Sequence, residues 1–559
     1  MCYKTSGREL ANAAGSDLQV LCVAVSKYPE RQSSLDHSLF RIAARALAVL
    51  LVSSLPLCAT DNPVVKTDLG LVRGKLSADG KIIIFLGIPY AAPPTGLLRW
   101  KPPQPAAPWS ETRSATAFGS HCMQLPIYSD MVFTDPGMSE DCLTLNIWVP
   151  AGTSGKLPVM VWIYGGGFQA GATSEPRQNG EALAHKGVIV VSMNYRLGMF
   201  GFFASGELTE ESPHHAAGNY GLLDQLAALR WVQRNIAAFG GDPSNVTIFG
   251  ESAGSFSVNA QMASPLSRSL IAHAIGESGG SVGRSALPMP NRETAQKDDE
   301  QFAKSVLHAG NLAALRAMSG EELLDRLKPL KNSFRFSPIV DGYFLPENIP
   351  AIFAANKQSQ IPLLAGWNKN EDHFQNPDKS GTFTVQSLND LAQQKFGSQA
   401  SEFLKVYRAT NDQEALLAAD DLSSDSFIGF GTWSWLEAQV KSGVASVFRY
   451  RFDLDSPGDP NHPATLGAFH SDEIEYVFGT LDSRKDTAWR PEDYKLSELI
   501  QAYWTNFAKS GNPNGKDIPD WPTYGPKESW QVMHLDQHSA AKPDEHRERY
   551  LFLQKAWSK

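Results

Sequence analysis

The stretch Gly-Glu-Ser-Ala-Gly at residues 250–254 decides the fold of this chain. It follows Val-Thr-Ile-Phe at residues 246–249, an apolar, β-branched run that predicts a buried strand, and residues 256–262 are compatible with the start of a helix. A G-x-S-x-G turn between a strand and a helix holds its serine in a strained conformation with the hydroxyl exposed. Ser252 is therefore a candidate nucleophile, although residues this common also form ordinary turns.

A second glycine-rich turn, Tyr-Gly-Gly-Gly-Phe at residues 164–168, directly follows the apolar run of residues 159–163. Consecutive glycines allow the backbone to point its N–H groups at a ligand with no Cβ in the way. When a serine attacks a carbonyl carbon, the oxygen becomes negative, and such N–H groups stabilise it. The two turns together favour acyl transfer over the alternative of a simple flexible loop.

The composition is that of a globular protein with a large core. Of 559 residues, 42% are hydrophobic and 19% charged, which suits either several average domains or one large α/β enzyme. A net charge of -9 and the lack of a basic stripe argue against a nucleic-acid partner. No apolar run after residue 60 is long enough to span a bilayer, which argues against stable membrane insertion. No cluster of cysteines and histidines has the spacing of a metal site.

Strand-like runs alternate with helix-like stretches along the chain. Residues 222–239 have the apolar spacing of a helix, which should stop at the Gly-Gly-Asp-Pro turn of residues 240–243. The alternation predicts a mostly parallel central sheet with helices on both faces, and residues 281–330 are expected to form a helical insertion over the active-site mouth. The first two strand-like runs could be antiparallel edge strands. The clearest such runs are residues 81–86, 143–149, 159–164, 187–193, 246–249, 361–365 and 447–452.

The N-terminal region carries a signal-like pattern that starts late. Residues 1–38 have no evident core pattern, whereas residues 39–59 contain Arg41 and Arg45, an apolar run, and the small Ala59 before a polar segment. That order is typical of a secretory signal. We therefore expect residues 1–38 to be a non-native extension from an early start assignment, residues 39–59 a signal peptide, and residues 60–559 an exported catalytic domain, periplasmic or secreted. The alternative is a buried helix of the fold.

The cysteine positions agree with export. Cys2, Cys22 and Cys58 lie in or before the signal, so the mature chain would keep only Cys122 and Cys142. An even pair close in sequence, in an exported chain, predicts one disulfide that closes a loop of about twenty residues.

Further motifs carry a resemblance to a known family. They are Phe-Leu-Gly-Ile-Pro-Tyr-Ala at residues 85–91, Glu-Asp-Cys-Leu at 140–143, Asn-Tyr-Arg at 194–196, Gly-Asn-Tyr-Gly-Leu-Leu-Asp-Gln at 218–225, and the two glycine-rich turns. From about residue 62 to residue 553 the chain resembles the type-B carboxylesterases, which include cholinesterases and bacterial broad-range esterases. The resemblance implies an α/β-hydrolase fold.

Chemistry alone leaves the acid and the base open, because the chain has 13 histidines and many carboxylates. The α/β-hydrolases place serine, acid and histidine in that order along the chain. The family's G-x-N-x-x-E pattern matches residues 366–371, and its histidine comes shortly before an E-I-E-Y-V-F-G signature, here residues 473–479. The resemblance therefore implies Glu371 as the acid and His470 as the base. Asp341 and Asp372 are the competing acids, and His462 is the competing base.

The resemblance also implies supporting residues. Glu251 and Ser278 match positions beside the catalytic residues. Arg99 with Glu140, and Arg196 with Asp224, match two ion pairs that connect loops to the sheet in this family. We expect both pairs to be structural and not catalytic.

The function implied is hydrolysis of carboxylic esters through an acyl-enzyme intermediate, with no cofactor. Ser252 would attack the carbonyl carbon while His470 takes its proton and Glu371 orients the imidazole. The oxyanion would be received by three backbone N–H groups, those of Gly166, Gly167 and Ala253.

The substrate is expected to be a small-molecule ester. Choline recognition needs an aromatic face for the cation, and cholinesterases place a tryptophan in the first disulfide loop. Residues 123–141 hold no tryptophan, which favours a general carboxylesterase. The alternatives are a catalytically silent adhesion protein on the same fold, and a lipase acting on longer acyl esters. The physiological ester and the oligomeric state stay open.

Overall fold

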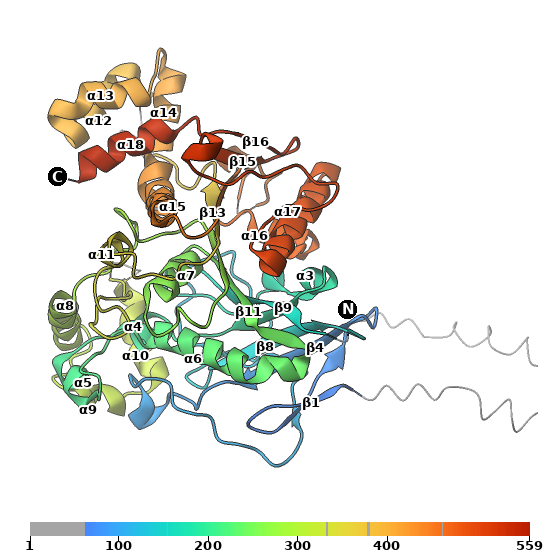
Figure 1. The fold of residues 1–559 in the computed structure, drawn as a ribbon. Helices are drawn as coiled ribbons and strands as arrows, with labels where there is room; N and C mark the ends of the chain where they lie inside the picture. The colour runs from blue at the N-terminus through green and yellow to red at the C-terminus, as the bar shows by residue number, and fades with distance from the viewer. Residues whose placement is uncertain (1–61, 154, 331–333, 377–380, 461, 559) are drawn as a thin grey trace, which may run out of the picture. The chain divides into compact units, whose positions relative to one another are not determined.

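The computed structural model describes residues 62–153, 155–330, 334–376, 381–460 and 462–558, which belong to one unit, Asn62–Lys559 (Figure 1). The predicted extension at residues 1–38 and the predicted signal at residues 39–59 lie outside the described residues.

An 11-stranded mixed sheet, counted over the described residues, forms the centre of this unit. Its strand order is β16-β15-β14-β13-β12-β11-β9-β10-β8-β4-β3. In chain order the strands are β3 (Lys75–Leu76), β4 (Ile82–Pro89), β8 (Thr144–Pro150), β9 (Leu157–Ile163), β10 (Ile189–Met193), β11 (Gly241–Glu251), β12 (His273–Glu277), β13 (Leu363–Asn368), β14 (Val447–Phe452), β15 (Gln531–Leu535) and β16 (Ala540–Pro543).

The middle of the sheet is parallel and its two ends are antiparallel. All neighbours from β10 through β15 pair in parallel, whereas β8 pairs antiparallel with both β10 and β4, and β16 with β15. Strands buried on both faces are near-continuous apolar runs, as in Val-Met-Val-Trp-Ile of β9, where every residue from Val159 to Ile163 is buried. The predicted mostly parallel sheet is therefore confirmed, together with the antiparallel pairing of β4 and β8. Neither of these two strands is at the edge, because β3 lies outside β4.

Helices cover both faces of the sheet (Figure 1). Helices α6 and α7 pack on one side of β11, and α17 packs on its other side together with α16 and α3. The helices are α3 (Glu181–His185), α4 (Gly198–Phe202), α5 (Gly206–Glu211), α6 (Tyr220–Asn235), α7 (Ala253–Ala263), α8 (Arg292–Ser305), α9 (Leu312–Ala317), α10 (Gly320–Leu327), α11 (Ile349–Ala354), α12 (Val385–Phe396), α13 (Ala400–Val406), α14 (Asp412–Ser424), α15 (Phe430–Ser442), α16 (Ile474–Phe478), α17 (Pro491–Ser510) and α18 (Arg547–Trp557).

The boundary between α6 and β11 corrects one sequence expectation. Helix α6 continues as a 3-10 turn, Ile236–Phe239, and stops at Gly240, whose φ is 86°. The predicted stop is therefore right, but residues 241–243 belong to β11 rather than to a separate turn. The register of β11 against β9 shifts between Gly241 and Val246, so the strand accommodates the Asp-Pro step in an irregularity.

The first loop region is anchored beside the sheet by a covalent bond. The sulfurs of Cys122 and Cys142, which are 20 positions apart, are joined in a disulfide. Cys122 lies in β6 (His121–Cys122), a two-residue strand that pairs in parallel with β7 (Met138–Ser139). A separate three-stranded sheet of β1 (Val64–Lys66), β2 (Leu71–Arg73) and β5 (Arg113–Ser114) lies near the N-terminal end of the unit. Within the described part of the chain, no helix is both long and apolar enough to cross a membrane.

Candidate active site

Ser252 lies at the point where β11 turns into α7. Its φ of 53° and ψ of -122° are outside the regions that most L-residues occupy, as a serine held in a tight strand-to-helix turn requires. The backbone N–H of Ser252 donates to the carbonyl of Glu277 at 2.8 Å, which fixes the turn to the neighbouring strand β12. The strain is therefore held by the sheet.

Glycine is required beside the serine because another backbone passes very close. A Cβ on Gly254 would lie 1.9 Å from the carbonyl oxygen of Ile163, and one on Gly250 would lie 2.5 Å from the same atom. The end of β9 and the start of α7 can approach this closely only without side chains. This contact places the loop after β9 directly next to Ser252.

The loop after β9 contains the three consecutive glycines. Gly166 and Gly167 have φ values of 93° and 62°, and a Cβ on Gly166 would lie 2.1 Å from the carbonyl oxygen of Ala170. Among the described residues, neither N–H of these two glycines donates to another group of the chain. Ala253 is the first residue of α7, where helical N–H groups also lack an acceptor. These N–H groups are available to a substrate oxygen.

His470 joins Ser252 to Glu371. Its Nε2 is 2.9 Å from Oγ of Ser252, and its Nδ1 is 2.5 Å from Oε2 of Glu371. Glu371 follows β13, and His470 lies in the loop between β14 and α16. The three side chains predicted from the family motifs therefore form one continuous hydrogen-bonded chain at the carboxyl ends of parallel strands, where open α/β sheets place their sites.

Glu371 is held by donors on its other oxygen. Its Oε1 accepts hydrogen bonds from the hydroxyl of Ser278 at 2.6 Å and from the backbone N–H of Asn368 at 2.7 Å. Asn368 also donates through Nδ2 to Glu473 at 2.6 Å and to the carbonyl of Phe469 at 2.7 Å. Ser278 thus lies where the resemblance implied. Asn368 and Glu473 were not singled out from sequence, although both fall inside the motifs that located Glu371 and His470.

The competing residues lie in other environments. Asp341 accepts backbone N–H groups of residues 343–345 and shapes its own loop. Asp372 accepts from the hydroxyl of Ser423. His462 pairs with Asp459 at 3.4 Å and stacks on Phe469. In the described part of the chain, none of the three forms a hydrogen bond or an ion pair with His470 or Ser252.

Carboxylates surround the imidazole and change its protonation. Oε1 of Glu251 lies 3.3 Å from Nε2 of His470. Burial lowers the pKa of His470, but Glu251 and Glu371 outweigh this and raise it to about 9. Burial raises the pKa of Glu251 to about 8 and that of Glu473 to about 7, against the opposing effect of His470. The protonation of Glu251, Glu473 and His470 is therefore interdependent.

A cavity of about 280 Å³, called the serine cavity below, opens over Ser252. The glycines of residues 165–167 form one side, and Phe427 and Ile428 come from a π-helical turn (Asp425–Gly429) between α14 and α15. The ring of Phe427 meets that of His470 edge-on at 5.2 Å between centroids. Ala286 and Leu287, from the stretch before α8, also line it, so the predicted insertion at residues 281–330 contributes to the cavity wall. No sequence signal indicated the π-helical turn.

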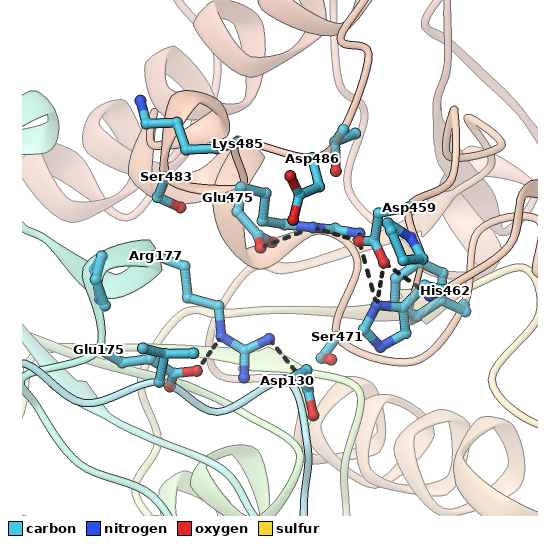
Figure 2. Close-up of a pocket in the computed structure, with 16 residues that line it drawn as sticks. Asp130, Glu175, Arg177, Asp459, His462, Ser471, Glu475, Ser483, Lys485 and Asp486 are labelled. Carbon is cyan, nitrogen blue, oxygen red and sulfur yellow. Dashed lines mark hydrogen bonds and ion pairs between the residues drawn. The ribbon is translucent and has the colours of Figure 1, made fainter. Parts of the chain in front are cut away.

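A second pocket of about 310 Å³, called the charged pocket, adjoins the serine cavity and shares Asp130, Arg177 and Ser471 with it (Figure 2). Arg177 pairs with Glu175 at 2.7 Å and with Asp130 at 3.5 Å. On the other side of this pocket Arg484 pairs with Asp459, Asp472 and Glu475. The charges of both arginines are thus matched within the protein.

The two family ion pairs also form. Arg99 contacts Glu140 at 2.5 Å and donates to the carbonyl of Met318, which ties the disulfide loop to the chain after α9. Arg196 contacts Asp224 at 2.7 Å, and both side chains are almost fully buried. Neither pair contacts the serine cavity.

One group of potential metal ligands lies on the described part of the chain. Asp79, Glu181 and His185 bring one potential ligand atom each within 4.8 Å of the others, on a partly exposed surface. None of the three lines the serine cavity.

The sheet order, the strained serine after β11, and the acid and histidine after later strands together define an α/β-hydrolase. The sequence pattern of the carboxylesterase family matches residues 61–553, and the chain belongs to that family. It is a carboxylic ester hydrolase.

Similar proteins are found in bacteria and in mammals. The chain is 37% identical to a fumonisin B1 esterase of Sphingopyxis macrogoltabida, over 84% of this chain and 87% of that protein. It is 36% identical to a para-nitrobenzyl esterase of Bacillus subtilis (strain 168), over 87% of this chain and 98% of that protein. A solved structure of a PNB esterase, 36% identical, superposes with a TM-score of 0.73 and covers 88% of this chain and 100% of its own. The expected family and fold are therefore both confirmed.

Proposed function

We propose that Ser252, His470 and Glu371 are the catalytic triad of this esterase and that hydrolysis proceeds through an acyl-enzyme. The observation that carries this proposal is the unbroken chain of hydrogen bonds from Oγ of Ser252 through His470 to Glu371, at 2.9 and 2.5 Å. It faces a cavity of about 280 Å³ beside two glycine N–H groups that have no acceptor among the described residues.

In the first half of the reaction, Oγ of Ser252 bonds to the ester carbonyl carbon while its proton moves to Nε2 of His470. The negative oxygen is received by the N–H groups of Gly166, Gly167 and Ala253. Glu371 keeps Nδ1 protonated and stabilises the imidazolium. When the C–O bond breaks, His470 returns the proton to the departing alcohol. Water then attacks the acyl-enzyme while His470 takes its proton, and His470 returns that proton to Oγ of Ser252 as the C–Oγ bond breaks and the acid leaves.

Labelling of Ser252 by a fluorophosphonate tests this proposal, because the probe needs an activated hydroxyl and not merely an exposed one. One equivalent should bind the wild-type enzyme, with the label on the peptide that contains Ser252. Ser252→Ala should bind none while keeping its fold. Stoichiometric labelling of a different serine, or no labelling of folded wild-type protein that also turns over no ester, would overturn the proposal. The latter result would favour a silent adhesion protein on the same fold.

We infer that the substrates are general carboxylic esters rather than choline esters. Within the described residues, no tryptophan lines the serine cavity, and the disulfide loop contributes Tyr128 and Met131 instead. Two relatives are named for esters other than choline esters, as a para-nitrobenzyl esterase and a fumonisin B1 esterase. Turnover of acetate and butyrate esters of choline and of 3,3-dimethylbutanol, its uncharged isostere, tests this point. A preference for the choline esters would contradict it.

We also propose that the enzyme is exported. The support is the basic, apolar and small-residue pattern of residues 39–59, together with the disulfide between Cys122 and Cys142.

A further inference from the structure

Arg335 borders the serine cavity next to the glycine loop. It lies in the chain between α10 and α11 and is exposed at the cavity mouth. A Cβ on Gly167 would lie 3.2 Å from Nη1 of Arg335 and 3.1 Å from the hydroxyl of Tyr128. The guanidinium and the phenol therefore lie over the glycine that is expected to receive the substrate oxygen.

The charge of Arg335 is not matched by the protein. Among the described residues it forms no ion pair, whereas Arg177, the other arginine of the serine cavity, pairs with Glu175 and Asp130 (Figure 2). Asp130 is half-buried and is engaged by Arg177. An arginine that is free of carboxylates and faces a cavity can bind an anion through two parallel N–H donors.

Tyr128 adds a neutral donor beside the guanidinium. Burial raises the pKa of Tyr128, and the charge of Arg335 and its hydrogen bond to the phenol oxygen only partly oppose this, so the phenol keeps its proton. An anion at this place would accept hydrogen bonds from both side chains.

The serine cavity is also lined by apolar side chains. They come from α7, from the stretch before α8, from the π-helical turn and from α16: Phe256, Leu287, Phe427, Ile428 and Ile474. An ester bound at Ser252 would therefore have an apolar part against these side chains and a part within reach of the Arg335 guanidinium.

We propose that Arg335 is a specificity-determining residue that binds a carboxylate of the substrate, and that the preferred substrates are esters carrying a second, anionic carboxyl group. This inference rests on the proposed function, because it assumes that Ser252 is the attacking group. Arg335 itself takes no part in bond making.

Matched ester pairs test the proposal on the full chain. Ethyl hydrogen glutarate and ethyl valerate share a five-carbon acyl chain and differ by a carboxylate on the acyl side. The second pair, 4-acetoxybenzoate and 4-tolyl acetate, differs by a carboxylate on the alcohol side. The acid released by each ester is followed by titration at constant pH, and kcat/KM is compared within each pair.

Three variants separate recognition from a structural effect. Arg335→Met removes the charge and keeps a long side chain, Arg335→Lys keeps the charge, and Arg230→Met removes an exposed cation from α6. In at least one pair, Arg335→Met should lower the charged-to-neutral ratio of kcat/KM on the order of tenfold, the lower end for a hydrogen bond to a charged group. Arg335→Lys should keep part of the preference, and Arg230→Met should keep all of it. The pair that responds identifies the side of the ester that carries the carboxylate.

Ionic strength gives an independent readout. The ratio should fall with added salt in the wild type and should be insensitive to salt in Arg335→Met, because Arg335 is exposed. An unchanged ratio in Arg335→Met for both pairs, or an equal loss on charged and neutral esters, would overturn the proposal. Hydrolysis of the neutral esters by the wild type would still support the proposed esterase, so the two proposals fail separately.

Discussion

The carboxylate of Glu251 lies 3.3 Å from Nε2 of His470, the nitrogen that faces Ser252. Since Glu371 holds Nδ1 of the same ring, the imidazole has a carboxylate at each end. The side chain of Glu251 is only 4% exposed, so its interaction with His470 is poorly screened by solvent. Glu251 and His470 therefore titrate as a coupled pair rather than as two independent groups.

Removing the charge of Glu251 should shift the pH profile of the enzyme. His470 accepts a proton only when neutral, and its pKa is raised from 6.5 to about 9, so kcat/KM should rise with pH from neutral into the alkaline range. Glu251→Gln removes a carboxylate that raises the pKa of His470. The rise of kcat/KM on the acid side of the profile, called the acid limb, should therefore move to lower pH. The measurement is kcat/KM for a short ester against pH. The exposed Asp486→Asn, in the charged pocket, is the control and should leave the limb in place. An acid limb that is unchanged or that moves to higher pH in Glu251→Gln would show that Glu251 and His470 are not coupled.

Substitution of each member of the proposed triad should nearly abolish turnover. Ser252→Ala and His470→Ala should each lower kcat on the order of 10⁴-fold or more, because the nucleophile or its base is lost. Glu371→Gln should also be severe, since the amide cannot stabilise the imidazolium. Hydrolysis of p-nitrophenyl acetate by variants with unchanged melting temperature measures this. If Glu371→Gln lost little turnover and Asp341→Asn lost most of it, Asp341 would be the catalytic acid. Near-normal turnover by Ser252→Ala would exclude Ser252 as the nucleophile.

The close approach of α7 to β9 should make Gly254 intolerant of a side chain. Gly254→Ala places a Cβ 1.9 Å from the carbonyl of Ile163, so the turn must shift, at a cost of about 1–3 kcal/mol or more in the free energy of unfolding. Gly310→Ala is the matched control, because nothing lies within 4 Å of its Cβ. Urea unfolding and fluorophosphonate labelling of both variants test the point. Equal stability and equal labelling rates in the two would show that the turn is not tightly packed.

Loss of the disulfide should affect stability more clearly than turnover at moderate temperature. Cys122 and Cys142 are 20 positions apart, and closing a loop of this size contributes about 3 kcal/mol in the chain-entropy model. The double variant Cys122→Ala/Cys142→Ala should therefore melt at a lower temperature than the wild type. Because Tyr128 and Met131 of this loop line the serine cavity, KM is the kinetic constant expected to respond first. Equal melting temperatures with and without a reductant would contradict a stabilising bond.

Export predicts a processed N-terminus. Protein isolated from its native host should begin near Thr60 or Asp61, after the small Ala59, and should hold no free thiol. Intact-mass and peptide mass spectrometry, with and without reduction, measure both properties. A chain that retains residues 1–38, or that carries free thiols at Cys122 and Cys142, would contradict export.

Local patterns predicted the elements that depend on neighbouring residues. The strand, the strained turn at Ser252 and the following helix form one continuous stretch. Their conformational preferences are therefore set by residues that are adjacent in sequence. The strand β14, Val447–Phe452, has the predicted boundaries for the same reason. Strand β12, His-Ala-Ile-Gly-Glu, was not predicted, because a short run with small and charged residues becomes a strand only between β11 and β13.

The sequence by itself determined the nucleophile turn, the glycine loop, the mostly parallel sheet and, through the family motifs, the candidates Glu371 and His470. It left Asp341, Asp372 and His462 open, because the partners in the site are 218 and 99 positions apart and no local pattern relates them. Only the tertiary structure decided that His470 meets both Ser252 and Glu371, that Glu251 lies against the same ring, and that Arg335 faces the cavity without a carboxylate among the described residues. These relationships depend on how parallel strands bring the ends of distant segments to one edge of the sheet, where through-space distances set hydrogen bonding and pKa.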